Sequence, residues 1–234
     1  QKKFEVIKVD SQTKQPIPGV QFRIWRDATL LGDYTTDENG KITIEKAPAG
    51  TYKVQEAATL QEYILNDKSV EIEHTSDKPT EITIENTKKP GLSIQKIDAE
   101  TRKPLANAVF KLSRANGDII KESIVTDSNG KALIEGLDAG DYVVTEVTAP
   151  GGYILDGNSR TVSLEAGETY TLTIENRKKP GLLIKKVDAE TKKPLAGASF
   201  KVTRGDGSIV RENATTDVDG IVHLAELDTG TYII

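Results

Sequence analysis

The sequence contains no cysteine and no methionine among its 234 residues. Without cysteine there can be no disulfide framework, no cysteine-ligated metal and no thiol nucleophile. Methionine is the other residue that oxidants readily modify, so the two absences together favour a protein exposed to an oxidising exterior. Covalent stabilisation, if the chain has any, has to come from chemistry other than disulfide formation.

Aromatic residues and long apolar runs are also scarce. Apolar side chains make up 36% of the chain and aromatic ones 5%, a supply suited to small domains with thin cores rather than one thick core. No apolar run approaches the length of a membrane span, so we expect no membrane insertion in this segment. The chain starts at Gln1 without a signal-peptide pattern, and we therefore expect a processed or excised piece of a longer protein.

The charge pattern, the lack of a partnered serine motif and the sparse histidines argue against a nucleic-acid-binding protein, an enzyme and a metal-binding protein. A net charge of −5 without a basic stripe argues against a nucleic-acid partner. Serine and threonine are frequent, but no G-x-S-x-G motif with a partnered base occurs, which argues against a turnover enzyme. His74 and His223 are far apart in the sequence and form no metal-binding pair, so we expect both to face solvent. We expect no metal and no cofactor.

The sequence repeats itself with a period near 90 residues. A period of this length lies above the solenoid range and predicts tandem domains rather than stacked repeats. The segments that open the three units are VIKVDSQTKQPIPGVQF at 6–22, IQKIDAETRKPLANAVF at 94–110 and IKKVDAETKKPLAGASF at 184–200. We predict domains at 1–88, 89–178 and 179–234, the third of them incomplete because its last strands are missing.

A short turn motif recurs in every unit. Its copies are TTDENGK at 35–41, VTDSNGK at 125–131 and TTDVDGI at 215–221. The Asn-Gly and Asp-Gly pairs accept the positive φ of tight primed turns, so we predict a hairpin at each. Asp37, Asp127 and Asp217 resemble half of a calcium-binding loop, but the regular ligands and the distal glutamate are absent, which favours plain turns.

The residue pattern within a unit predicts an all-β fold. Runs of Val, Ile, Thr, Tyr and Phe alternate with clusters of Asn, Asp, Gly and Pro every 8 to 15 residues. About seven strands in each unit favour tandem immunoglobulin-like or prealbumin-like β-sandwich domains. The joints TKKPG and RKKPG are short and contain proline, so we expect the units to form a semi-rigid rod.

Strand alternation places polar residues on otherwise apolar faces. In the strand that ends with TIEN, Asn86 shares a face with Ile82 and Ile84. A lysine near the start of each unit and a glutamate two residues after a Tyr-x-Val motif are placed in the same way. The two complete sets are Lys8, Glu56 and Asn86 in the first unit and Lys96, Glu146 and Asn176 in the second.

Two interpretations of these sets remain open from the residues alone. An unpaired buried charge is costly in a small core, so we expect the three groups of a set to meet. In the first interpretation a Lys–Glu ion pair is hydrogen-bonded to Asn, which stabilises the fold little. In the second, burial disfavours both charges and leaves a neutral amine beside a protonated acid. The amine then attacks the Asn carboxamide, ammonia leaves, and an amide joins the two side chains.

Three motifs give the chain a family resemblance. They are the K-x-D motif that starts at Lys8, Lys96 and Lys186, the Y-x-V-x-E-x-x-A-P-x-G-Y motif from Tyr142 to Tyr153, and the closing I-E-N. The sequence resembles the B-type domains of Gram-positive collagen adhesins and pilins, also called SpaA-like or prealbumin-like. The resemblance covers essentially the whole chain. It implies stalk domains of cell-wall-anchored proteins, with intramolecular Lys–Asn isopeptide bonds that a Glu promotes.

Carried over to this chain, the resemblance implies a bond from Lys8 to Asn86 with Glu56 as the acid. It implies a second bond within the set of Lys96, Glu146 and Asn176. The first unit departs from the middle motif, since it has EAATLQEY where the second has EVTAPGGY. We expect this departure to loosen the loop that follows Glu56.

The third unit departs further. Lys186 is present, but the spacing of the second unit places its Glu near 236 and its Asn near 266, beyond Ile234. We expect an unbonded, incomplete domain with an unpaired Lys186. A less favoured idea is that its open strand edges accept a strand from another copy.

Two functional hypotheses follow. The first is an extracellular stalk segment of an adhesin or pilus on the bacterial cell wall surface, monomeric, whose partner is the rest of the same surface protein. In it, any contact with a host matrix protein is made by a domain outside this segment. The alternative is a segment that itself binds a host extracellular-matrix protein, although the units offer no large insertion and no aromatic patch beyond Trp25.

Overall fold

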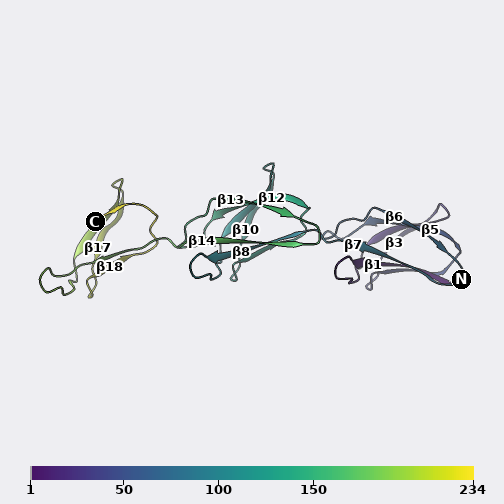
Figure 1. The fold of residues 1–234 in the computed structure, drawn as a ribbon, viewed down its shortest axis with the longest axis horizontal. Helices are drawn as coiled ribbons and strands as arrows, with labels where there is room; N and C mark the ends of the chain where they lie inside the picture. Colours follow the sequence, from purple (N-terminus) through teal and green to yellow (C-terminus); the bar gives the residue numbers. More distant parts are fainter. Residues whose placement is uncertain (1) are drawn as a thin grey trace.

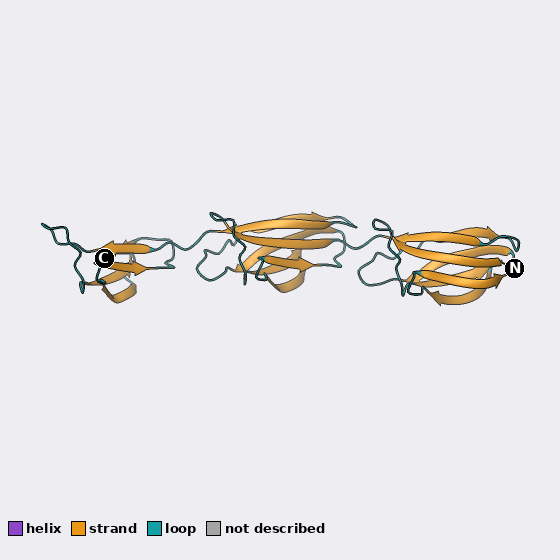
Figure 2. Ribbon diagram, turned by 90° about the horizontal axis from the view of Figure 1, so that it is seen from below, coloured by secondary structure: helices purple, strands orange, loops and turns teal. Residues whose placement is uncertain are grey.

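The computed structural model describes residues 2–234 of the chain as three β-strand units in a row. Figure 2 shows strands and loops throughout these units and no helix. The N-terminus lies at the far end of unit one, and unit three lies at the opposite end of the row (Figure 1). The predicted all-β fold of tandem sandwiches is confirmed.

Unit one is a sandwich of two sheets. Its strands are β1 (Lys2–Asp10), β2 (Gln21–Arg26), β3 (Thr29–Thr35), β4 (Lys41–Ala47), β5 (Gly50–Ala58), β6 (Ser69–His74) and β7 (Thr80–Asn86). One sheet has the order β4-β1-β7 and the other β3-β2-β5-β6. The core between them contains Phe4, Val6, Phe22 and Tyr52, all fully buried.

Unit two repeats this arrangement. Its strands are β8 (Gly91–Asp98), β9 (Val109–Arg114), β10 (Ile119–Val125), β11 (Lys131–Ile134), β12 (Gly140–Thr148), β13 (Ser159–Leu164) and β14 (Thr169–Asn176). The sheet orders are β11-β8-β14 and β10-β9-β12-β13, which match those of unit one strand for strand. Leu92, Ile94, Phe110 and Tyr142 lie in its core.

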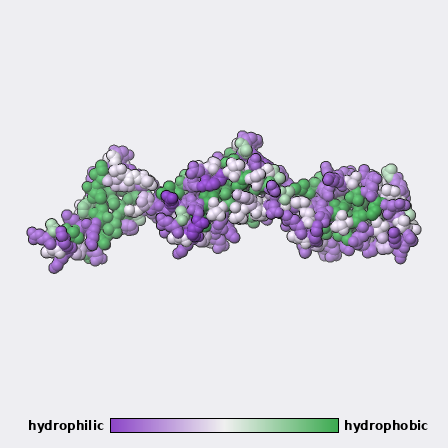
Figure 3. Space-filling model, in the orientation of Figure 1, coloured by the Kyte–Doolittle hydropathy of each residue, from purple (hydrophilic) through white to green (hydrophobic). Residues whose placement is uncertain are grey.

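Unit three has fewer strands in the described residues. They are β15 (Leu182–Lys185), β16 (Ser199–Arg204), β17 (Ile209–Thr215), β18 (Ile221–Leu224) and β19 (Tyr232–Ile233). Strand β15 pairs with β18, and within residues 2–234 it has no parallel neighbour like those of β1 and β8. Its buried cluster is small, and Figure 3 shows an apolar area at the surface of this unit. Among the apolar residues of unit three, Leu183 and Ile233 are more than half exposed.

The first and last strands of a complete unit are parallel neighbours. In unit one, Lys8 is level with Ile84, and Asp10 is level with Asn86. Lys8 and Asn86 are therefore diagonal neighbours on the same face of the sheet, within reach of long side chains. Unit two has the same register, with Lys96 level with Ile174 and Asp98 level with Asn176.

The Asn39-Gly40 turn does not form the predicted hairpin. Strand β3 before it belongs to the β2 sheet, whereas β4 after it pairs with β1 in the other sheet, so the turn crosses between sheets. The expected positive φ is present, at 68° for Gly40. The Asp37 carboxylate accepts the backbone N–H groups of Asn39 and Lys41, which explains the recurring aspartate without a bound metal.

His74 is fully buried, so the prediction that it faces solvent was wrong. Its ring packs edge-on against Phe4 and Tyr52. Nε2–H donates to the Ala47 carbonyl at 3.2 Å, and Nδ1 is hydrogen-bonded to the Thr80 hydroxyl at 2.8 Å. Both ring nitrogens thus have hydrogen-bond partners within the core. His223 is exposed, as predicted.

Trp25, which the sequence did not place, lies half-buried on β2. Its ring is covered by the Lys53 ammonium, 5.3 Å from the ring centroid.

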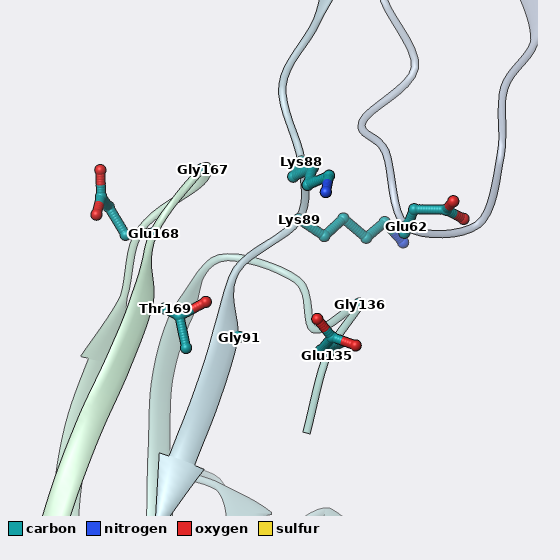
Figure 4. A pocket seen from close by; sticks show the side chains of 9 residues that line it. All are labelled: Glu62, Lys88, Lys89, Gly91, Glu135, Gly136, Gly167, Glu168 and Thr169. Atoms are coloured by element: carbon teal, nitrogen blue, oxygen red, sulfur yellow. The ribbon is translucent and has the colours of Figure 1, made fainter. Parts of the chain in front are cut away.

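The joint between units one and two is bonded on both sides. The Lys89 N–H donates to the Glu62 carbonyl of unit one at 2.8 Å, and the Pro90 carbonyl accepts the Leu137 N–H of unit two at 3.1 Å. The Lys89 ammonium also lies 3.1 Å from the Asp138 carboxylate. Figure 4 shows the polar hollow at this joint, with Lys88 and Lys89 on the linker beside loops of both units.

The second joint repeats these contacts. Lys179 N–H donates to the Gly152 carbonyl, and the Pro180 carbonyl accepts the Leu227 N–H, each at 2.8 Å. The Lys179 ammonium lies 3.0 Å from Asp228. At both joints, the lysine of the linker is thus hydrogen-bonded to the preceding unit and the proline after it to the following unit.

Candidate functional site

The backbone of the predicted nucleophile is held by the glycine turn. Lys8 N–H donates to the Gly40 carbonyl at 2.8 Å, and the Lys8 carbonyl accepts the Ile17 N–H at 2.9 Å. A Cβ on Gly40 would lie 2.6 Å from the Lys8 carbonyl oxygen, so only glycine fits here. The same close approach occurs between Gly130 and Lys96. The recurring turn therefore fixes the strand that carries the lysine.

The structure brings Lys8, Glu56 and Asn86 together in the core of unit one. All three side chains are buried, and that of Lys8 is 0% exposed. Lys8 Nζ donates to Asn86 Oδ1 at 2.5 Å and lies 2.8 Å from Glu56 Oε2. Asn86 Nδ2 donates to Glu56 Oε1 at 2.6 Å. The amide oxygen thus faces the amine, and the amide nitrogen faces the acid.

The same triangle forms in unit two from Lys96, Glu146 and Asn176. Lys96 Nζ donates to Asn176 Oδ1 and lies 3.2 Å from Glu146 Oε1. Asn176 Nδ2 donates to both oxygens of Glu146, at 2.9 and 3.1 Å. One difference is that Glu146 Oε2 also accepts the backbone N–H of Asp156 at 2.9 Å.

Burial sets the electrostatics of both lysines. Removal from water lowers the pKa of Lys8 from its ordinary value, although the hydrogen bond and the charge of Glu56 act in the opposite direction. Burial likewise lowers the pKa of Lys96 against the charge of Glu146. The Phe22 ring centroid lies 5.7 Å from Lys8 Nζ, and this apolar wall helps to exclude water. A lowered pKa increases the fraction of neutral, nucleophilic amine.

The arrangement fits both interpretations drawn from the sequence. As an ion pair, each cluster places the lysine ammonium within 3.2 Å of a glutamate oxygen. Transfer of one proton from the lysine to the glutamate gives a neutral amine, a protonated acid and a carboxamide in mutual contact. Those are the three groups that amide exchange between side chains needs.

Lys186 is placed differently from its two counterparts. Its backbone keeps the repeated contact, because Lys186 N–H donates to the Gly220 carbonyl at 2.7 Å. Its side chain is exposed and forms no ion pair with any acidic group in residues 2–234. Unit three therefore presents the lysine without the groups that surround Lys8 and Lys96.

Next to each cluster lies a tyrosine–aspartate hydrogen bond that was missed in the sequence, on an aspartate level with the asparagine of the cluster. Tyr63 donates its hydroxyl hydrogen to Asp10 Oδ2 at 3.1 Å, and Tyr153 donates to Asp98 Oδ2 at 2.8 Å. Burial, together with the bond to the aspartate, raises the pKa of Tyr63 and Tyr153 to about 12. The sequence contained a signal for this contact. Asp10 is the last residue of a K-x-D motif, and Tyr153 is the last residue of the Y-x-V-x-E-x-x-A-P-x-G-Y motif.

The loop after Glu56 keeps the backbone contacts of its tyrosine despite its divergent sequence, although within residues 2–234 Glu56 Oε2 accepts no hydrogen bond like that from Asp156 N–H to Glu146. Tyr63 N–H donates to the Leu60 carbonyl at 3.0 Å, as Tyr153 N–H donates to the Pro150 carbonyl at 3.1 Å. Tyr63 also forms a β-bridge with Lys88, matched by that of Tyr153 with Lys178. The loop keeps its anchor despite the changed residues.

Other kinds of site find little support in the described residues. Across residues 2–234, no three His, Asp or Glu side chains gather closely enough to ligate a metal ion. The same part of the chain has no helix with the length and apolar character needed to cross a bilayer.

Comparison with known proteins agrees with this geometry. The family described as SpaA, prealbumin-like fold domain, matches residues 2–88, 90–178 and 181–234. The chain belongs to this prealbumin-like domain family. Its two clusters thus lie in domains of one family, repeated along one chain.

Two curated relatives of these prealbumin-like domains are named as an adhesin and as a surface protein. The chain is 34% identical over 160 residues to the collagen adhesin of Staphylococcus aureus, which covers 63% of this chain. It is 30% identical over 136 residues to the trypsin-resistant surface T6 protein of Streptococcus pyogenes, which covers 55% of this chain. The matched regions span 13% and 25% of those proteins, so the chain corresponds to a minor part of each.

A solved pilin structure shares the fold. The shaft pilin SpaA of Lactobacillus rhamnosus GG aligns with a TM-score of 0.51 and 16% identity, over 76% of this chain and 98% of the pilin. At this identity the likeness concerns the fold alone.

Proposed function

We propose that this chain is a structural stalk segment of a bacterial surface adhesin or pilus, stiffened by isopeptide bonds between Lys8 and Asn86 and between Lys96 and Asn176. The observation that carries the proposal is the pair of fully buried Lys–Glu–Asn triangles at equivalent places in two units. The similarity of the chain to an adhesin and to a surface protein supports the proposed place in a bacterial surface protein.

The proposed reaction balances without a cofactor. The neutral Lys8 amine attacks the side-chain carbonyl carbon of Asn86, whose oxygen is 2.5 Å from Nζ. Glu56 takes a proton from Nζ and delivers one to Nδ2, which leaves as ammonia when the C–N bond breaks. An amide between Nζ and Asn86 remains, and Glu56 regains its starting protonation state. The folded core supplies the proximity, so one turnover suffices.

The placement of the bond suits a load-bearing role. Force applied to the ends of unit one enters along β1 and leaves after β7, which are parallel neighbours. A bond from Lys8 to Asn86 passes that force from one strand to the other and bypasses the 78 positions that separate the two residues. The rest of the sandwich then carries no tension.

The proposed location is extracellular, on the cell wall surface of a Gram-positive bacterium, with three domains at 1–88, 89–178 and 179–234. The chain acts as a monomeric part of its parent protein and is no turnover enzyme. Unit three contributes its Lys186 without the acid and amide needed for a bond within the described residues.

The alternative is direct binding of a host matrix protein. One relative carries the name collagen adhesin, yet the matched region is 13% of that protein. In this chain the one tryptophan, Trp25, is half-buried, and the Lys53 ammonium lies over its ring. Binding of the isolated segment to collagen would favour this alternative, whereas the stalk role predicts none.

Peptide mapping tests the cross-links residue by residue. Digestion should release a branched peptide that joins the Lys8 and Asn86 segments, and another that joins those of Lys96 and Asn176. Separate linear peptides from a natively folded protein would contradict the proposal.

A further inference from the structure

A threonine completes the hydrogen bonding of the reactive amide in unit one. The Asn86 carboxamide nitrogen has two hydrogens. One is donated to Glu56 Oε1 at 2.6 Å, and the other to Thr59 Oγ1 at 2.9 Å. The amide oxygen accepts a hydrogen bond from Lys8, so the oxygen and both N–H hydrogens of the Asn86 amide have partners.

The second unit lacks this contact. Glu56 and Glu146, and likewise Asn86 and Asn176, are 90 residues apart, so the counterpart of Thr59 is Ala149. Alanine has no hydroxyl, and both hydrogen bonds of Asn176 Nδ2 go to Glu146 instead. Thr59 belongs to the part of unit one that departs from the motif in unit two.

The contact bears on the reaction because it holds the leaving group. Attack needs the amide oxygen and carbon turned toward Lys8 and the nitrogen turned toward the acid that protonates it. The Thr59 hydroxyl accepts a hydrogen from that nitrogen and so opposes rotation of the amide away from this orientation. The Thr59 hydroxyl neither gains nor loses a proton in the reaction, because the proton passes from Lys8 through Glu56 to the departing ammonia.

We propose that Thr59 is a positioning residue of the unit-one site, which orients the Asn86 carboxamide and thereby speeds formation of the Lys8–Asn86 bond. This inference rests on the cross-linking function proposed above. Unit two achieves the same orientation through the two oxygens of Glu146, without a hydroxyl.

The test follows bond formation in freshly translated, full-length chain that is quenched in acid at intervals. Mass spectrometry of the digested samples gives the loss of ammonia from each unit separately. Unit two in the same molecule serves as the internal clock, so the measured quantity is the ratio of the two rates. The variants are Thr59→Val, which keeps the shape and removes the hydroxyl, and Thr59→Ser, which keeps the hydroxyl.

Thr59→Val should lower the unit-one rate relative to unit two about fivefold, the equivalent of one neutral hydrogen bond. Thr59→Ser should restore most of the rate. Because the hydroxyl does not titrate, the loss in Thr59→Val should be the same factor across the neutral pH range. Circular dichroism of each variant confirms that unit one folds before the rates are compared.

The outcomes separate the two proposals. An unchanged rate ratio in folded Thr59→Val, or an equal loss in Thr59→Ser, overturns the role of Thr59 while the cross-link stands. If neither unit of the unsubstituted chain loses ammonia, the cross-linking function itself fails.

Discussion

Lys8 and Asn86 lie in contact on adjacent parallel strands although 78 positions separate them in the sequence. The pairing of β1 with β7 joins the entry and exit strands of the unit, and the diagonal register brings the amine to the amide. Lys96 and Asn176 have the same relationship on β8 and β14. The repeated geometry makes the two units independent tests of one chemistry.

Removal of either acid should abolish one bond only. Glu56→Ala should leave Lys8 and Asn86 unjoined while the Lys96–Asn176 bond still forms, because the clusters lie in separate cores. Glu146→Ala should have the opposite effect. Peptide mapping checks both, and Glu85→Ala is the control, since Glu85 is an exposed residue of β7 that pairs with Lys14. Loss of both bonds in a folded single variant would contradict independent sites.

Loss of a bond should destabilise its own unit strongly. By analogy with a disulfide, closing a loop of this length contributes about 4 kcal/mol through the unfolded state. Glu56→Gln should therefore lower the melting temperature of unit one by more than about 15 °C in scanning calorimetry, given the size of the unit. Glu146→Gln should shift only the transition of unit two. A shift of a few degrees would show that the core, and not the bond, stabilises the unit.

Acid should weaken unit two through Asp98. The Thr101 N–H and the Tyr153 hydroxyl donate to its carboxylate and hold its pKa well below the usual range, although burial acts the other way. A group with a lowered folded pKa stabilises the fold fully above its unfolded pKa of about 3.9, and this contribution is lost as the pH falls toward the folded pKa.

Asp98→Asn should therefore flatten the decline in stability of unit two below about pH 4. Because the bond would mask unfolding, the comparison uses Glu146→Gln with and without Asp98→Asn, followed by denaturant titration at a series of pH values. The same decline in both chains would assign the acid sensitivity to other groups. Unit one provides the internal reference.

High salt should leave the extended shape of the chain unchanged, whereas insertion of residues into a joint should disturb it. Exposed ion pairs such as Lys89–Asp138 contribute at most about 1 kcal/mol, so screening them should leave the rod extended. Two glycines inserted between Lys89 and Pro90 should separate the backbone bonds to Glu62 and Leu137 and broaden the distribution of lengths. Small-angle scattering measures both. Shortening of the unmodified chain in high salt would show that the ion pairs maintain the shape.

Much of each cluster could be predicted because strand alternation is a strict rule. Lys8, Glu56 and Asn86 each share a face with apolar residues, and all three are buried as the alternation predicts. His74 shares a face of β6 with Ile72, so the same rule is compatible with its burial, whereas its isolation from His223 led us to expect a solvent-facing residue. Its burial depends on Ala47 and Thr80, which lie on other strands.

Other features depend on tertiary contacts that residue types do not specify. The Asn39-Gly40 pair has the conformation its residues favour, yet the chain after it enters the other sheet, because β4 pairs with β1. Thr59 looked like part of a divergent loop, and its contact with Asn86 arises only when β5 and β7 face each other across the core.

The intact mass of the unsubstituted protein tests the central claim most directly. Formation of both bonds predicts a mass lower than that of the sequence by two ammonia molecules, and Glu56→Ala and Glu146→Ala should each restore one of them. An unmodified mass for the folded, unsubstituted chain would contradict the account and leave the buried clusters as ion pairs.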